Sequence, residues 1–433
     1  IIAESKIHKN EIKGIGISYQ MHGLVLIGKD KQVLCPSIIW CDSRAVEIGD
    51  RIFDEIGEEK CMKELLNSPG NFTASKLKWV QENAPEIYDK IWKFMLPGDF
   101  IAFKLSGEAT TSVTGLSEGI LWDFEKHEVS KTMLQHLKID ESFVSDIVEN
   151  FTEQCYVSKQ GAEESGLPEG IPIYYRAGDQ PNNAFSLNVM NLGEIAATGG
   201  TSGVVYGVTD NIKSKESVRI NNFAHINHTK ERPRISKMLC LNGAGIQYSW
   251  LRHQVDQKRH SYHEINDLAS KIPIGSDGVI VLPFGNGAER VLHNKDIGSS
   301  VFNLNFNRHK SEHLFRAGLE GIAYSFVYGT DILMSDGLQK GIIKAGGDNL
   351  FRSSLFTQTI TTILDTEIRI INSTGSTGAA RAAAMGAGAF ESQNEILTDK
   401  DILKSYYPDT KNYNQYKDSY EKWKLKLLQN LNN

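Results

Sequence analysis

The 433-residue sequence predicts an α/β fold in two domains. The chain is longer than one ordinary hydrophobic core supports. Strand signals alternate with helical periodicity from Lys13 to Ile56, and a second strand region begins at Ile171. Three glycine-rich strand or hairpin ends follow in the second half. We therefore expect two α/β domains, residues 1–189 and 190–433, that flank a cleft.

The first half contains short strands followed by helices. Asp42-Ser43-Arg44 opens a helix through about Ile56, with Asp42 or Ser43 placed to cap it. Residues 75–137 show apolar residues at three- and four-residue spacing, including 87–92, which predicts a chiefly helical insertion. Strands are expected at 13–18, 24–27 and 33–36, with 38–40 extending the sheet edge.

The second sheet region begins with the apolar strand 171–179 and continues through a hairpin around Gly200. Its long helix, 312–323, has an apolar face. The helix at 378–389 is rich in Ala and Gly, which permits close packing. Two further strands are expected in this sheet, at 278–283 and 341–347.

Composition and charge argue against a nucleic-acid-binding, membrane-spanning or disulfide-rich protein. A net charge of −6 gives no electrostatic reason to bind nucleic acid or an acidic membrane. No run approaches 18 apolar residues, so no membrane span is expected. Five cysteines without a C-x-x-C pair favour a reducing, cytoplasmic location over a disulfide framework or zinc ribbon.

Common nucleotide and metal motifs are missing from the sequence. Neither G-x-x-x-x-G-K-[ST] nor a complete G-x-G-x-x-G after a strand occurs. The histidines of the segment 260–264 do not have the order of a zinc-binding helix, and we expect this segment to be a solvated surface.

Asp179 ends the strand 171–179 at the edge where α/β sheets bind ligands. A carboxylate there can accept the proton of an attacking hydroxyl group. Because Pro181 and apolar residues follow, a helix cap is the alternative interpretation of Asp179. Gly199-Gly200-Thr201-Ser202-Gly203 predicts either a tight hairpin turn or a backbone cradle for phosphate. Two similar glycine-rich segments, 242–246 and 344–349, favour the cradle.

These motifs together resemble the FGGY carbohydrate kinases of the actin-like ATPase superfamily, and among them most closely the xylulokinases. The similarity covers nearly the whole chain. The order of its most specific segments also matches the family: Gly16–Gly23, Ile38–Asp42, Ala177–Gln180, Gly200–Gly203 and Ala345–Asn349.

The resemblance implies two actin-like, ribonuclease H-like domains, with a sugar-binding N-terminal and a nucleotide-binding C-terminal domain. Asp179 would be the general base and would contact the sugar. Met21, His22 and Asp42 would line the sugar pocket, although His22 alone could be an ordinary polar residue. The nucleotide side would be formed by Gly200, Thr201, Gly245, Gly347, Asp348 and Asn349.

ATP and Mg²⁺ are the implied cofactors. The resemblance implies no direct protein ligand to the metal; Asp179 would contact it indirectly. D-xylulose is the expected substrate, and a homodimer is one expectation for the assembly. A ketopentose is neutral, so hydrogen-bonding groups are expected around it rather than a carboxylate-binding arginine fork.

Some family features are altered or missing. The Asp-x-Gly-Thr strand with which the family starts does not occur, and we expect it upstream of Ile1, so that the first domain lacks its N-terminal strands. Residues 375–380 lack an acidic residue before the helix, and 286–290 is longer than the usual Gly-Glu-Arg form. The alternatives are therefore a kinase for another keto-sugar or polyol, such as L-ribulose, or a chain that binds ligand without turnover.

Overall fold

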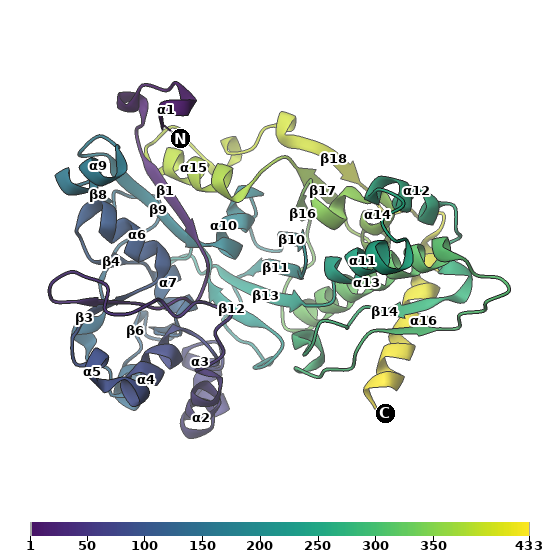
Figure 1. The fold of residues 1–433 in the computed structure, drawn as a ribbon, viewed down its shortest axis with the longest axis horizontal. Coiled ribbons are helices and arrows are strands. Elements are labelled where there is room, and N and C mark those ends of the chain that lie inside the picture. The colour runs from purple at the N-terminus through teal and green to yellow at the C-terminus, as the bar shows by residue number, and fades with distance from the viewer. Residues whose placement is uncertain (1, 433) are drawn as a thin grey trace.

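The computed structural model describes residues 2–432 as an α/β protein built around two sheets. In Figure 1 the purple and blue elements lie on one side and the green helices on the other, with strands of the larger sheet between them. The strands are β1 (Ile15–Tyr19), β2 (Val25–Gly28), β3 (Ile91–Met95), β4 (Thr110–Thr111), β5 (Trp122–Asp123), β6 (Glu128–Val129), β7 (Asp146–Ile147), β8 (Cys155–Tyr156), β9 (Pro172–Gly178), β10 (Ile195–Gly199), β11 (Gly203–Thr209), β12 (Asn221–Ala224), β13 (Ile235–Leu241), β14 (Ile280–Leu282), β15 (Ser300–Phe302), β16 (Ile343–Gly346), β17 (Ile368–Ile371) and β18 (Ile402–Tyr406).

The helices connect and cover these strands. They are α1 (Ile2–Ser5), α2 (Val46–Ile56), α3 (Glu58–Glu64), α4 (Thr73–Asn83), α5 (Pro85–Tyr88), α6 (Pro97–Ser106), α7 (Val113–Glu118), α8 (Lys131–Leu137), α9 (Lys159–Ser165), α10 (Asp179–Ser186), α11 (Gly245–Trp250), α12 (Tyr262–Ser270), α13 (Ser311–Ser335), α14 (Ser354–Leu364), α15 (Gly375–Gly386) and α16 (Tyr413–Leu431).

The smaller sheet has the order β1-β9-β8, with β1 parallel to β9 and β8 antiparallel to it. Because side chains alternate along a strand, Ile17 and Tyr19 of β1 pack against α6. Gly16 faces the other side, where a Cβ would lie 2.0 Å from the backbone oxygen of Ala379. Glycine at position 16 therefore lets α15 lie directly on the sheet.

Helix α15 joins the two halves of the chain. It follows β17 of the larger sheet, yet it packs against β1, β9 and α10. In Figure 1 this yellow-green helix lies beside the purple β1. A segment from the C-terminal half thus completes the layer over the first sheet and supports the strand that ends at Asp179.

The larger sheet has the order β12-β13-β11-β10-β16-β17-β18. Ile195 and Ala197 of β10 belong to the core formed with α13 and α14. Ala196, between them, belongs to the core that includes Leu24 and Phe72 of the first half. One face of this sheet is therefore covered by the C-terminal helices, and the other packs toward the first domain.

The predicted strands at 171–179 and 341–347, the hairpin around Gly200 and the helices at 312–323 and 378–389 are confirmed with shifted ends. Residues 33–36 and 38–40 contribute only the isolated bridges Ile27–Val33 and Leu24–Ile38. The strand at 278–283 was expected in the large sheet, but β14 pairs with β15 in a separate ribbon.

Two helix predictions in the first half are confirmed only in part. The helix after Asp42 begins only at Val46, with Ala45 as a cap residue that makes no side-chain bond. Asp42 instead accepts the N–H of Arg44 at 3.1 Å, which holds the chain in a turn. Within the predicted helical insertion, residues 91–95 form β3, because β2 supplies an antiparallel partner that local periodicity does not reveal.

Candidate active site

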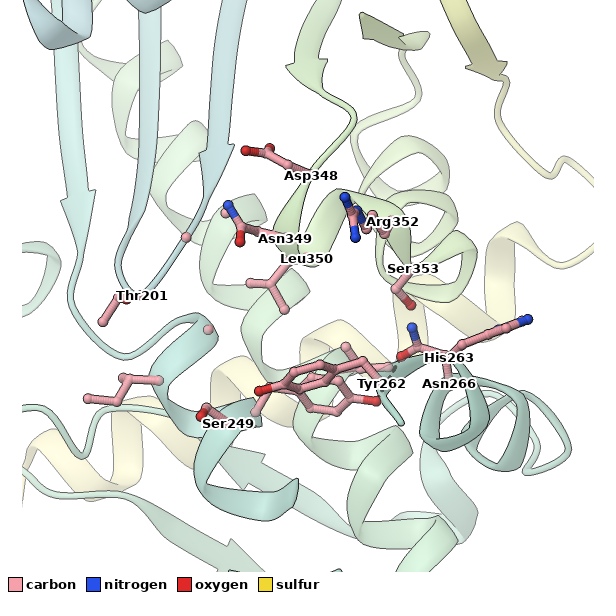
Figure 2. A pocket seen from close by; sticks show the side chains of 16 residues that line it. Thr201, Ser249, Tyr262, His263, Asn266, Asp348, Asn349, Leu350, Arg352 and Ser353 are labelled. Carbon is pink, nitrogen blue, oxygen red and sulfur yellow. Dashed lines mark hydrogen bonds between the residues drawn. The ribbon is translucent and has the colours of Figure 1, made fainter. Parts of the chain in front are cut away.

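A cavity of about 740 Å³ lies at the ends of β10 and β16. Asp348, Asn349 and Arg352 lie on one side of it, and Ser249 and Tyr262 on the other (Figure 2). Five of the six residues predicted on the nucleotide side line it. The full lining is Gly199, Gly200, Thr201, Gly245, Ile246, Tyr248, Ser249, Tyr262, His263, Asn266, Leu319, Asp348, Asn349, Leu350, Arg352 and Ser353.

The hairpin turn at one edge of the cavity is held by the start of α11. The Gly245 N–H donates to the Gly200 carbonyl at 3.0 Å, and the Ile246 N–H donates to the Thr201 carbonyl at 3.0 Å. A Cβ on Gly245 would lie 2.3 Å from the Gly200 oxygen. Position 245 therefore requires glycine, because two backbone segments meet there.

Gly245→Ala is expected to move the hairpin and to raise the KM for ATP about tenfold, since overpacking typically costs about 1–3 kcal/mol. Steady-state kinetics with varied ATP measure this effect. The sugar affinity, measured by calorimetry without nucleotide, is expected to stay within about twofold. An unchanged KM for ATP would contradict a nucleotide-binding role for the hairpin.

The end of β16 forms the facing edge of the cavity. Asn349 has a left-handed backbone with φ of 49°, which turns the chain into a short 3₁₀ segment, Asn349–Arg352. Gly347, the sixth predicted residue, is not among the cavity-lining residues. A Cβ there would meet Leu403 at 2.5 Å, so this glycine allows close packing beneath the turn.

An aromatic pair forms the floor of the cavity. The rings of Tyr248 and Tyr262 stack with centroids 5.9 Å apart, and the Arg252 guanidinium lies 4.7 Å from the Tyr262 ring centre. The Tyr248 hydroxyl donates to Asn266 Oδ1 at 2.8 Å. Such a surface can stack against a nucleobase. Sequence analysis missed it: Tyr262 and His263 are exposed, as predicted for 260–264, but they face the cavity.

The predicted sugar-side residue His22 lies in the first domain. Its Nδ1 is 2.9 Å from the Glu118 carbonyl, an acceptor only, so Nδ1 carries the proton and Nε2 is an acceptor. Burial lowers the pKa of His22 to about 3, which keeps the ring neutral. The ring packs edge-on to Phe72 and against Phe223, whereas Met21 is buried beside it in the same core.

The turn that carries His22 is fixed by Lys76, a residue that the sequence did not single out. From α4, the Lys76 ammonium donates to the backbone carbonyls of His22 at 2.8 Å and Ile39 at 2.9 Å. Its side chain is buried, and burial lowers its pKa to about 8. One cation therefore ties together the two segments predicted to contact the sugar.

Asp42 follows the second of these segments and is partly exposed. Its carboxylate binds the Arg44 guanidinium through two contacts, at 2.9 and 2.7 Å, which lowers the pKa of Asp42. Asp42 caps no helix, so the prediction that it caps the helix ending at Ile56 is wrong. A sugar hydroxyl would have to compete with Arg44 for this carboxylate.

Asp179 is the first residue of α10, directly after β9. Gly178 is the helix cap residue, and no side-chain capping bond is made, so the helix-cap alternative for Asp179 is wrong. The side chain is exposed, although nearby protein atoms raise its pKa through partial loss of solvation. Asn183, one turn later, donates to Thr198 of β10 at 3.0 Å, which links the helix of Asp179 to the glycine hairpin.

A buried carboxyl group holds the loop that leads into α11. Glu289 is fully buried and accepts the backbone N–H groups of Asn242 at 2.9 Å and Gly243 at 2.5 Å. Burial outweighs these two bonds and raises the pKa of Glu289 to about 7. The segment 286–290, which departs from the family pattern, therefore supports the cavity through backbone contacts.

This raised pKa predicts a pH-dependent stability. In the folded state Glu289 keeps its proton up to about pH 7, whereas in the unfolded chain it loses the proton near the ordinary value of 4.5. The unfolded state thus binds fewer protons between these values, and stability falls as pH rises from about 4.5 to 7. Relative to Glu289→Gln, the melting temperature of the wild type is expected to drop by a few degrees between pH 5 and 8; parallel curves would contradict this.

Family models match both halves of the chain. The N-terminal domain model of the FGGY family of carbohydrate kinases matches residues 1–186, and the C-terminal domain model matches residues 195–387. The chain is 27% identical to the xylulose kinase of Haemophilus influenzae, covering 97% of this chain and 85% of that protein. It is also 27% identical to the xylulose kinase of Bacillus subtilis, covering 98% and 84%.

Solved structures share the fold at lower identity. The xylulose kinase from Rhodospirillum rubrum superposes with a TM-score of 0.87 at 22% identity, covering 98% of this chain and 85% of that one. A gluconate kinase from Lactobacillus acidophilus gives 0.84 at 21%, covering 98% and 85%. A Plasmodium falciparum glycerol kinase with ADP gives 0.85 at 21%, covering 96% and 84%. The predicted two-domain, actin-like α/β fold is confirmed, and it is shared by proteins named for different substrates.

Proposed function

Because the chain belongs to the FGGY family of carbohydrate kinases, we propose that it transfers the γ-phosphoryl group of ATP to a terminal hydroxyl of D-xylulose. Phosphorylation of a sugar by ATP follows from the family; the choice of D-xylulose is the further step. It is supported by the similarity to xylulose kinases over nearly the whole chain. The residues on the first domain fit a neutral sugar, because the neutral His22 presents a hydrogen-bond acceptor.

The observation that carries the mechanism is the position of Asp179. Its exposed carboxylate follows β9 directly, and its helix is bonded to the hairpin strand that leads to Gly200. We assign Asp179 as the general base that accepts the hydroxyl proton while the hairpin holds the phosphates in line. The raised pKa of this carboxyl makes it a better proton acceptor than an ordinary aspartate.

The two parts of the chain would bind different substrates. Residues 1–189 would bind the sugar through Met21, His22 and Asp42. Residues 190–433 would bind the nucleotide in the cavity between the hairpin and the β16 turn, with the adenine ring against Tyr262. This side comprises Gly200, Thr201, Gly245, Asp348 and Asn349, with Gly347 beneath the turn.

Mg²⁺ would enter with ATP and offset the charge that develops on the phosphates. Within residues 2–432 no three His, Cys, Asp or Glu side chains form a metal cluster. A single carboxylate fits the metal, because Mg²⁺ keeps several waters and takes other ligands from substrate phosphates. Asp179 would contact it indirectly through water; its carboxylate accepts hydrogen bonds from the N–H and the side-chain amide of Gln180.

No helix in the described part of the chain has the length and apolarity needed to span a membrane. All five cysteines are described and are free thiols, which supports the cytoplasm as the proposed location. The assembly, including the expected homodimer, stays a prediction.

The substrate is tested by coupled measurement of ADP release from the purified protein with D-xylulose, L-ribulose, glycerol and gluconate. We expect D-xylulose to give the highest kcat/KM. Turnover with another of these acceptors but not with D-xylulose would move the assignment to another member of the family. Calorimetric binding of ATP or sugar without ADP release would identify a ligand-binding protein without turnover.

A further inference from the structure

Arg290 has no acidic partner in the part of the chain that the structure describes. It opens a short 3₁₀ turn, Arg290–Leu292, and its Nη2 donates to Asn221 Oδ1 at 2.5 Å. Its Nε is buried and has no hydrogen-bond partner among residues 2–432. Burial lowers the pKa of Arg290, and no carboxylate in the described chain offsets that effect. Most buried polar groups in proteins have a hydrogen-bond partner, so an unpaired guanidinium donor calls for an explanation.

The Arg290 guanidinium contacts β12 at Asn221, and its neighbour Glu289 holds the loop that leads into the nucleotide cavity. Burial is the main cause that lowers the pKa of His22, and the positive charge of Arg290 lowers it further. Asn221 begins β12, and Phe223 two residues later packs against His22 with ring centres 5.3 Å apart. Through Asn221, Arg290 therefore reaches the strand that packs against His22 on the proposed sugar side.

An unpaired and partly desolvated guanidinium is costly unless a ligand brings the missing negative charge. A neutral keto-sugar brings none. The phosphoryl group that passes from ATP to the sugar carries charge on three oxygens, and the planar guanidinium fork matches phosphate geometry. The free donors of Arg290 thus fit the group in transfer better than they fit either the sugar or a structural partner.

We propose that Arg290 is a catalytic residue that binds the phosphoryl group during transfer; this rests on the proposed function. In the step, the sugar hydroxyl oxygen forms a bond to the γ-phosphorus, and the bond from that phosphorus to the β,γ-bridging oxygen breaks. The electron pair of the broken bond leaves on ADP, and the hydroxyl proton passes to Asp179. Arg290 keeps all its protons and donates hydrogen bonds to the oxygens of the phosphoryl group.

Arg290→Met and Arg290→Ala test the proposal together. We expect both to lower kcat about 10²-fold or more, as loss of one donor to a developing charge typically does, while the calorimetric Kd for the sugar changes less than threefold. Added guanidinium ion is expected to restore part of the kcat of Arg290→Ala, a rescue that a merely structural role would not give. The control is Arg369→Met, because Arg369 pairs with Glu367 at 2.8 Å and is partly exposed.

A second readout needs no sugar. Binding of inorganic phosphate in the presence of ADP is expected to weaken at least tenfold in Arg290→Met but not in Arg369→Met. If the wild type phosphorylates no sugar, the substrate proposal fails, and the phosphate measurement alone decides the role of Arg290. Unchanged phosphate binding, or a loss of sugar affinity with unchanged kcat, would overturn the proposal. Melting curves of all variants identify any that fail to fold.

Discussion

Asp179→Asn is expected to lower kcat for sugar phosphorylation by about 10²–10⁴-fold, the usual contribution of a general base. The amide has nearly the same shape as the carboxylate but cannot accept the hydroxyl proton. Because Asp179 forms no ion pair with residues 2–432, the substitution leaves no partner charge unpaired among them. Its two contacts, with the N–H and side chain of Gln180, are local to the start of α10.

The same variant is expected to bind the sugar with nearly the wild-type Kd, which calorimetry measures in the absence of ATP. This combination separates a base from a residue that only positions the substrate. Asp365→Asn is the matched control, because Asp365 lies on the surface and pairs only with Lys340. If Asp179→Asn retains more than a tenth of the wild-type kcat, Asp179 is not the base.

Local signals in the sequence predicted the elements that carry this chemistry. The apolar run before Asp179 and the glycines around Gly200 define a strand end and a hairpin without help from distant residues. Their proximity was predicted too, since both stand at the ends of strands. The bond between Asn183 and Thr198 adds the contact that connects them.

Features that depend on distant partners were missed. Nothing local in Gly375–Gly386 indicates that α15 leaves its own sheet to cover β1, because the reason is the room made by Gly16. Lys76 reads as a surface lysine on an amphipathic helix until two carbonyls are seen around its ammonium. The sequence shows Arg290 only as part of the segment 286–290, which is longer than the usual Gly-Glu-Arg form; the unpaired Nε becomes visible only in the fold.

The second large effect concerns stability. Lys237 of β13 and Asp336, after α13, form an ion pair at 2.5 Å with side chains 0% and 2% exposed. Asp336 also accepts bonds from the Ser214 hydroxyl at 2.6 Å and the Lys215 N–H at 2.7 Å. Lys237→Met leaves this carboxylate buried without its counterion, which is expected to cost about 3–5 kcal/mol of unfolding free energy.

The same Lys→Met substitution is expected to cost much less unfolding free energy at an exposed ion pair than at the buried one. Lys340 and Asp365 form an ion pair at 3.1 Å, and their side chains are 45% and 67% exposed. Lys340→Met is therefore expected to cost less than about 1 kcal/mol of unfolding free energy. Adding Asp336→Asn to Lys237→Met removes the unpaired charge and keeps an acceptor for the Lys215 N–H. The double variant should therefore recover at least half of the stability lost by Lys237→Met in chemical denaturation. If the double variant is less stable than Lys237→Met alone, the loss arises from packing around β13 and not from the uncompensated carboxylate.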